Sequence, residues 1–275
     1  MPYLPLEIKI WFFGLLAILG LSAGSFISCI TYQINKENFS LKSIWRRSKC
    51  PKCGRKLSVF DNVPLLSYIL LSGKCRTCQK RISKRYPLLE LAGLATFLLV
   101  GLGYILEIGI IGEYKSQLDL WSLPYILFLA TGLLAITVAD LENQIIPDVI
   151  VISLISIHLL LLTFFISSPV LFTNFFAGSA ASIFFLTLCI LTRGRGMGLG
   201  DVKLAFLIGI IAGPVTWVAI FLAFVIGAGF GLLMVGLGRA RFGKPIPFGP
   251  FLVLGTFIVM LLGDKIEIML LGGVV

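Results

Sequence analysis

Long apolar runs separated by short polar segments make up most of this 275-residue chain. A helix that crosses a membrane needs about 20 mostly apolar residues, and eight runs reach or approach that length. The sixth and eighth are short for a full crossing. The pattern predicts an all-α polytopic membrane protein with about eight transmembrane helices, at residues 11–34, 87–111, 124–139, 147–166, 170–191, 202–212, 215–237 and 250–262.

Composition and charge support this class and orient it. Hydrophobic residues make up 58% of the chain and charged residues 13%, which excludes a water-soluble globular domain. Residues 35–86 carry a net charge of +12, more than the +10 of the whole chain. Because cytoplasmic loops are rich in Lys and Arg, we place this loop in the cytoplasm and the N-terminus outside. The same side then receives the later basic residues Arg193, Arg195, Arg239, Arg241 and Lys244.

The predicted organisation has three parts. Residues 1–34 contain the first transmembrane helix, residues 35–86 form a basic cytoplasmic loop, and residues 87–275 form a transmembrane helical bundle. The loop's charge suits anionic lipid headgroups at the bilayer surface. We do not expect nucleic-acid binding, because the basic residues are interspersed with cysteine pairs and lie beside a membrane.

Two aspartates stand out as candidate catalytic residues. Asp140 ends the third apolar run and Asp201 begins the sixth, so counting helices brings both to the cytoplasmic side. A carboxylate at such a place is costly and marks a functional site. Neighbouring carboxylates in a low-dielectric site do not both ionise cheaply, so one keeps a proton while the other accepts one. That asymmetry suits aspartyl proteolysis, in which an activated water attacks a peptide carbonyl.

The glycines before Asp201 fit this chemistry. Gly198 and Gly200 lack a Cβ, so the backbone can approach a substrate closely. The Gly-rich segment 194–200 can also offer backbone groups to an extended peptide. The alternative is that Asp201 merely caps a helix after a Gly-rich turn.

Other polar residues have supporting or structural interpretations. Asp148 is the rival acid, although an acid directly after Pro147 suits the first turn of a helix. Glu90 can meet a basic substrate or complement a helix dipole. Lys203 can tune the acids or extend to the membrane interface, and His158 is interpreted as a hydrogen-bonded structural residue.

Two Cys-x-x-Cys pairs lie in the basic loop with 21 residues between them. Four thiolates at two turns match a tetrahedral structural zinc site, which leaves no open position for water. The loop has few large apolar residues, so metal binding would help it fold. Disulfides are the alternative, and a reducing cytoplasm opposes them. The predicted zinc ligands are Cys50, Cys53, Cys75 and Cys78.

Five motifs, in order along nearly the whole chain, closely resemble the type IV prepilin peptidase family. They are GSF at 24–26, YPLLE at 86–90, DLENQIIPD at 140–148, GDVKL at 200–204 and KPIPFGP at 244–250. The resemblance implies an inner-membrane GxGD aspartyl protease that cuts the basic leader from type IV prepilins or pseudopilins, typically after Gly. Asp140 and Asp201 match its catalytic acids, and the Cys-paired loop matches its long-form members.

The resemblance also implies a second activity, since many members methylate the new N-terminus, often a Phe, with S-adenosylmethionine. The residues themselves show no nucleotide-binding fingerprint. Two other classes stay open: a transporter with intramembrane acids, and a non-catalytic zinc-knuckle scaffold of a secretion machine. A transporter would more often place its acids near the bilayer midplane. The sequence indicates neither the physiological prepilin nor the oligomeric state.

Overall fold

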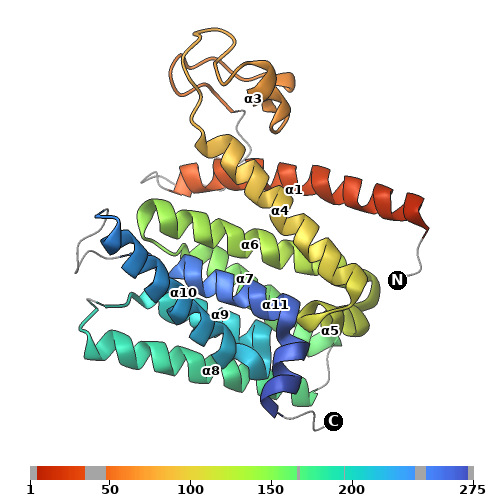
Figure 1. Ribbon diagram of the computed structural model, residues 1–275, viewed down its shortest axis with the longest axis vertical. Helices are drawn as coiled ribbons and strands as arrows, with labels where there is room; N and C mark the ends of the chain where they lie inside the picture. The colour runs from red at the N-terminus through yellow and green to blue at the C-terminus, as the bar shows by residue number, and fades with distance from the viewer. Residues whose placement is uncertain (1–4, 35–47, 166–167, 195, 239–245, 272–275) are drawn as a thin grey trace. The chain divides into compact units, whose positions relative to one another are not determined.

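A computed structural model describes residues 5–34, 48–165, 168–194, 196–238 and 246–271. These residues are helical apart from turns and two isolated bridges, which confirms the predicted all-α class (Figure 1). Six segments among them are long and apolar enough to cross a membrane. These are α1 (Leu6–Ile34), α4 (Arg85–Leu106), α6 (Ser122–Asn143), α7 (Asp148–Phe165), α8 (Ser168–Leu191) and the stretch Leu199–Gly236.

The stretch Leu199–Gly236 contains two of the predicted helices. It divides into α9 (Leu199–Ala212), the short 3-10 helix η3 (Gly213–Val215) and α10 (Thr216–Gly236). A shorter apolar segment then begins α11 (Gly249–Leu271). Each of the eight predicted apolar runs therefore corresponds to a helix.

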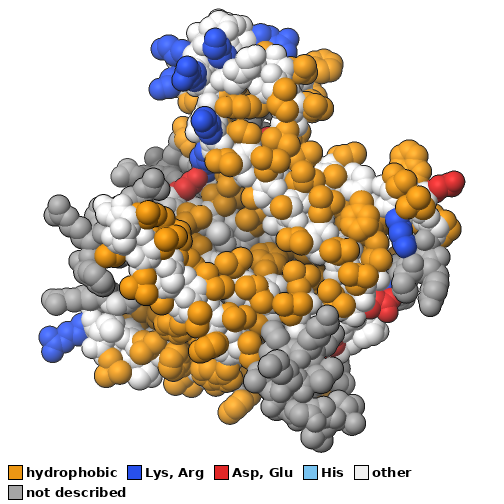
Figure 2. All heavy atoms as spheres, viewed as in Figure 1, with side chains coloured by type: hydrophobic (Ala, Val, Ile, Leu, Met, Phe, Trp, Pro, Cys, Tyr) orange, Lys and Arg blue, Asp and Glu red, His pale blue; other side chains and the backbone are white. Residues whose placement is uncertain are grey.

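The face of the molecule drawn in Figure 2 is strongly hydrophobic, with extensive orange side chains. Large aromatic residues stand outward on the helices, among them Phe172, which is 70% exposed, and Phe176, which is 75% exposed. Apolar patches of this extent are rare on soluble monomers. The surface is that of a protein surrounded by lipid.

The chain divides into two compact units, residues 1–102 and 103–275. In the first, α1 and α4 approach each other through glycines: a Cβ on Gly24 would lie 2.3 Å from the Leu89 carbonyl oxygen. The segment between them includes the 3-10 helix η1 (Phe60–Asn62) and α3 (Leu66–Leu70). Close approach at small residues is typical of helix pairs in membranes.

In the second unit, α9 lies at the centre and contacts α7, α8, α10 and α11. Most of its length from Val202 to Ala212 is buried. Gly209 of α9 faces Gly178 of α8 so closely that a Cβ on Gly209 would lie 2.3 Å from the Gly178 Cα. The helix that carries Asp201 is thus enclosed by its neighbours.

The predicted second helix, residues 87–111, differs from the structure at its end. Helix α4 stops at Leu106, and the chain turns into a separate short helix, α5 (Gly109–Leu118), followed by η2 (Asp119–Trp121). Glu107 and Gly109 both have positive φ, 54° and 61°. A Cβ on Gly109 would lie 2.3 Å from a carbonyl oxygen of α11, so the turn needs glycine. Apolarity continues through this turn, and the run therefore concealed the break.

The predicted orientation in the membrane stays a prediction. Arg193 is exposed just after α8. The other basic residues used to orient the bundle lie outside the described residues: Arg195, Arg239, Arg241 and Lys244.

Candidate active site and metal site

One cavity, of about 440 Å³, brings the two predicted acids together. Asp140 reaches it from the last turn of α6, and Asp201 from the first turn of α9. The loop between α6 and α7 completes the wall. The lining residues are Asp140, Gln144, Ile145, Ile146, Pro147, Asp148, Gly198, Gly200 and Asp201.

Asp140 is buried, with 5% of its surface exposed. Its Oδ2 accepts a hydrogen bond of 2.9 Å from the backbone N–H of Gly249, the first residue of α11. A Cβ on Gly249 would lie only 2.6 Å from that oxygen. Gly249 therefore belongs to the site, and sequence reasoning missed it even though it lies in the 244–250 motif. No local signal pairs it with an aspartate 109 positions away.

Asp201 is the third residue of α9, and its Oδ2 accepts a 3.2 Å hydrogen bond from the Gly198 N–H. Gly198 is the extended N-cap, with φ −87° and ψ 159°. The capping interpretation is therefore correct for one carboxylate oxygen, while the same side chain lines the cavity. A Cβ on Gly200 would lie 3.0 Å from the Ile146 Cβ, so this glycine lets α9 begin close to the loop before α7.

Asp148 and Lys203 form an ion pair with each other. The Lys203 Nζ lies 2.7 Å from the Asp148 Oδ1, and both side chains are about half exposed. The pair joins the first turn of α7 to α9. Lys203 is thus paired with the rival acid, and an exposed pair of this kind contributes about 0–1 kcal/mol.

Glu90 makes a hydrogen bond within the N-terminal unit. It is buried in α4 and accepts a 2.8 Å hydrogen bond from the Leu65 N–H. Leu65 has a positive φ of 57° just before α3. This hydrogen bond anchors the loop within the N-terminal unit, and a supporting role of Glu90 beside the acid pair stays a prediction.

The four predicted zinc ligands form one cluster, with sulfur atoms all within 4.8 Å of one another. A tetrahedral zinc with Zn–S bonds of about 2.3 Å places its sulfurs roughly 3.8 Å apart, so the cluster fits a metal ion. The described cysteines are free thiols. The ligands are Cys50, Cys53, Cys75 and Cys78.

The two Cys-x-x-Cys turns repeat one backbone pattern. Cys50 N–H donates to Arg55 O and Gly54 N–H donates to Cys50 O, each at 2.9 Å. Cys75 and Gln79 make the equivalent bonds in the second turn, each at 3.0 Å. In that turn, backbone N–H groups directed at the sulfur lower the pKa of the Cys75 thiol to about 6. Such donors favour the thiolate, which is the form that binds metal.

These features define a class of protein: a polytopic membrane protein with two carboxylates in one cavity and a cluster of four cysteines that could hold a metal ion. Residues 18–104 match the bacterial peptidase A24 N-terminal domain, and residues 127–235 match the type IV leader peptidase family. The chain belongs to the type IV leader peptidase family, which confirms the resemblance seen in its motifs.

Two curated relatives are similar in sequence to this chain over most of their length. The chain is 32% identical over 273 residues to a prepilin leader peptidase/N-methyltransferase of Pseudomonas aeruginosa, covering 90% of each chain. It is 35% identical over 225 residues to a protein of the same name from Stutzerimonas stutzeri, covering 80% of this chain and 73% of that one. No solved structure matches the chain significantly.

Proposed function

We propose that this chain is an integral membrane aspartyl endopeptidase that removes the basic leader from type IV prepilins or pseudopilins. Asp140 and Asp201 are its catalytic acids. The observation that carries the proposal is that these two carboxylates, from helices far apart in sequence, line one cavity in a chain of the leader peptidase family.

The chemistry follows from two carboxyl groups that share one proton. The ionised group takes a proton from water, the hydroxide attacks the scissile carbonyl, and the protonated group supplies a proton to the oxyanion or the leaving amine. Each acid is held through its Oδ2 by one backbone N–H, that of Gly249 or Gly198. Each therefore has a fixed orientation and a second oxygen for water or substrate.

The surroundings suit a substrate that is half basic and half apolar. Exposed Leu141, Ile145 and Leu199 lie beside the acids along the chain, where they can contact the apolar helix that follows a prepilin leader. We place the site at the cytoplasmic face of the inner membrane, so that a basic leader stays in the cytoplasm while this helix remains in the bilayer. The scissile bond then lies near the interface.

Two cofactors complete the proposal. Cys50, Cys53, Cys75 and Cys78 would hold one structural zinc, whose binding energy stabilises a loop with little core. The names of the relatives support a second activity, methylation of the new N-terminus with S-adenosylmethionine. No residue is assigned to that cofactor.

Asparagine variants of the three aspartates in the cavity test the proposal with a built-in control. The substrate is a synthetic peptide with a Lys-rich leader ending in Gly, followed by Phe and an apolar segment, and product mass reports both cleavage and methylation. We expect Asp140→Asn and Asp201→Asn to lose at least about 1,000-fold in kcat, since each removes a group essential to acid–base chemistry. Asp148→Asn should keep turnover within about threefold, because its ion pair with Lys203 is exposed.

Other outcomes would contradict specific parts of the proposal. Normal cleavage by both Asp140→Asn and Asp201→Asn would favour the alternatives, in which the chain is a scaffold or a transporter. Loss of cleavage with Asp148→Asn but not with Asp140→Asn would mean that the rival acid is catalytic.

A further inference from the structure

At the C-terminal end of helix α9, the Ile210 carbonyl lacks its usual helical hydrogen-bond donor. Its 14 residues span about 21 Å, less than the roughly 30 Å of a bilayer core. Pro214 lies four positions after Ile210, and because proline has no N–H it removes the donor that the Ile210 carbonyl would have in a continuing helix. Ile210 and Ile211 are fully buried. A buried carbonyl without a donor is strongly unfavourable in an apolar environment.

Side chains from three other helices satisfy these carbonyls. The Ile210 oxygen accepts from His158 Nε2 of α7 at 2.7 Å and from Asn174 Nδ2 of α8 at 3.1 Å. The Ile211 oxygen accepts from the Tyr114 hydroxyl of α5 at 3.1 Å. We call Tyr114, His158 and Asn174 the α9 clamp.

The protonation of His158 follows from its partners. A carbonyl oxygen only accepts, so Nε2 carries the hydrogen, and Nδ1 is left to accept from the Tyr125 hydroxyl. The ring is fully buried. His158 is thus hydrogen-bonded and buried, as the sequence interpretation expects, and its bond with Tyr125 links the clamp to α6.

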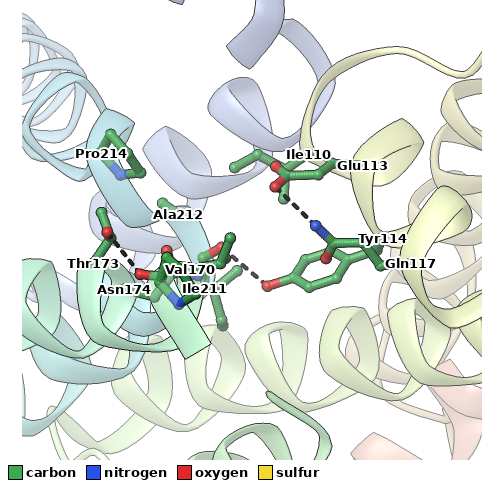
Figure 3. Close-up of a pocket in the computed structure, with 11 residues that line it drawn as sticks. Ile110, Glu113, Tyr114, Gln117, Val170, Thr173, Asn174, Ile211, Ala212 and Pro214 are labelled. Atoms are coloured by element: carbon green, nitrogen blue, oxygen red, sulfur yellow. Dashed lines mark hydrogen bonds between the residues drawn. The ribbon is translucent and has the colours of Figure 1, made fainter. Parts of the chain in front are cut away.

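A small cavity of about 260 Å³ lies beside the clamp and is lined in part by Tyr114 and Asn174 (Figure 3). Its polar side chains donate to acceptors of the chain itself. The Tyr114 hydroxyl points at Ile211 O, Thr173 donates to Pro169 O, and Gln117 donates to Glu113. The Tyr114 hydroxyl thus holds the end of α9, whereas Thr173 and Gln117 bond acceptors one turn earlier in their own helices.

The clamp acts at the opposite end of the helix from Asp201. The α-helix is continuous from Asp201 to Ile210, so a shift along the axis at one end is transmitted to the other. Where α8 and α9 touch at Gly178 and Gly209, their backbones are in direct contact, and Phe175 of α8 packs edge-on against Phe206 of α9. The hydrogen bonds of the clamp add to this packing, because they end on particular carbonyls and so define the axial position of α9.

We propose that the α9 clamp fixes the axial position of α9 and thereby sets Asp201 at its working distance from Asp140. Tyr114, His158 and Asn174 are thus positioning residues for the acid pair. The proposal rests on the proposed function, because it assigns the clamp to a helix whose first turn carries a catalytic acid.

The test compares two tyrosines. Tyr114→Phe removes one oxygen and leaves the Ile211 carbonyl without its clamp donor. Tyr104→Phe is the matched control, because Tyr104 is similarly buried, at 8% exposed, but its hydroxyl bonds the Ser122 hydroxyl instead of a helix-end carbonyl. Both are purified as monodisperse protein in detergent, and kcat, KM and Tm are measured with the synthetic leader peptide.

We expect Tyr114→Phe to lower kcat about tenfold with KM changed less than about twofold, because small displacements of a reacting group cost rate steeply. Tyr104→Phe should keep the wild-type kcat. Asn174→Leu is the milder variant, since the Ile210 oxygen keeps its bond from His158, and its kcat should fall about threefold. A role in stability alone would lower Tm and yield in Tyr114→Phe and leave kcat per folded molecule unchanged.

Asp201→Asn is measured in parallel to separate the two proposals. If Asp201→Asn cleaves at the wild-type rate, the proposed function fails. If Asp201→Asn is inactive while Tyr114→Phe matches Tyr104→Phe, the function stands and the clamp proposal is overturned. If Tyr114→Phe does not fold, Asn174→Leu decides: wild-type kcat in that variant overturns the proposal.

Discussion

Gly249→Ala should slow the enzyme without unfolding it. The new Cβ would lie 2.6 Å from the Asp140 Oδ2 and 3.3 Å from its Cγ. An ordinary carbon–oxygen contact begins near 3.4 Å, so the two groups must separate by roughly 0.8 Å. Asp140 is buried, and any such movement also stretches the 2.9 Å hydrogen bond from the Gly249 N–H. A displacement near 1 Å costs up to about 100-fold in rate, and we expect kcat to fall about 10- to 100-fold.

The backbone gives no competing reason for a loss. Gly249 does not have a positive φ, and it is the first residue of α11, so alanine meets no backbone strain there. Tm in detergent should therefore stay within about 3 °C of the wild-type value, since a change of about 1 kcal/mol moves Tm by a few degrees. Gly229→Ala is the matched control: Gly229 lies in α10, and a methyl group added there would meet open space, with no described atom within 4 Å.

The assay is cleavage of the synthetic leader peptide, followed by mass spectrometry at saturating and limiting substrate. If Gly249→Ala turns over at the rate of Gly229→Ala, the close contact between α11 and Asp140 does not position the acid. The proposed role of Gly249 in the site would then be wrong.

Two further predictions concern the metal site and the ion pair. Cys50→Ser combined with Cys53→Ser should reduce bound zinc from about one per chain to none by metal analysis, because two of four ligands are lost. The control Cys189→Ser, in α8, should keep the metal. Unchanged zinc in the double variant would contradict the assignment. Lys203→Met should change stability by at most about 1 kcal/mol and kcat by less than about threefold, because its pair with Asp148 is half exposed. A loss in kcat above about tenfold would show that Lys203 acts on the catalytic acids.

The sequence was sufficient to predict that the two candidate catalytic acids lie together, because both their chemistry and the order of the membrane helices point to one site. Asp140 and Asp201 each stand where an apolar run meets a polar turn, and counting helices across the bilayer predicts that both lie on one side. The structure brings them into one cavity. The cysteine pairs were equally predictable, because thiol spacing alone limits what they can bind.

Contacts made only by tertiary folding could not be predicted in this way. Gly249 meets Asp140 from a distant helix, and its motif gives no hint of that partner. Glu90 turned out to hold Leu65, a residue in an irregular loop. The α4–α5 turn at Glu107 was hidden because hydrophobicity continues across it, and hydrophobicity is the signal that predicted the helices.

The most direct test of the central claim is the turnover of the double variant Asp140→Asn with Asp201→Asn beside each single variant. Groups that work as a unit lose their effect together, so the double variant should be no slower than the slower single variant. All three should retain only a trace of peptide cleavage on prolonged incubation. Losses that multiply, or a single variant that keeps substantial turnover, would mean that the two carboxylates do not act as a pair on one peptide bond.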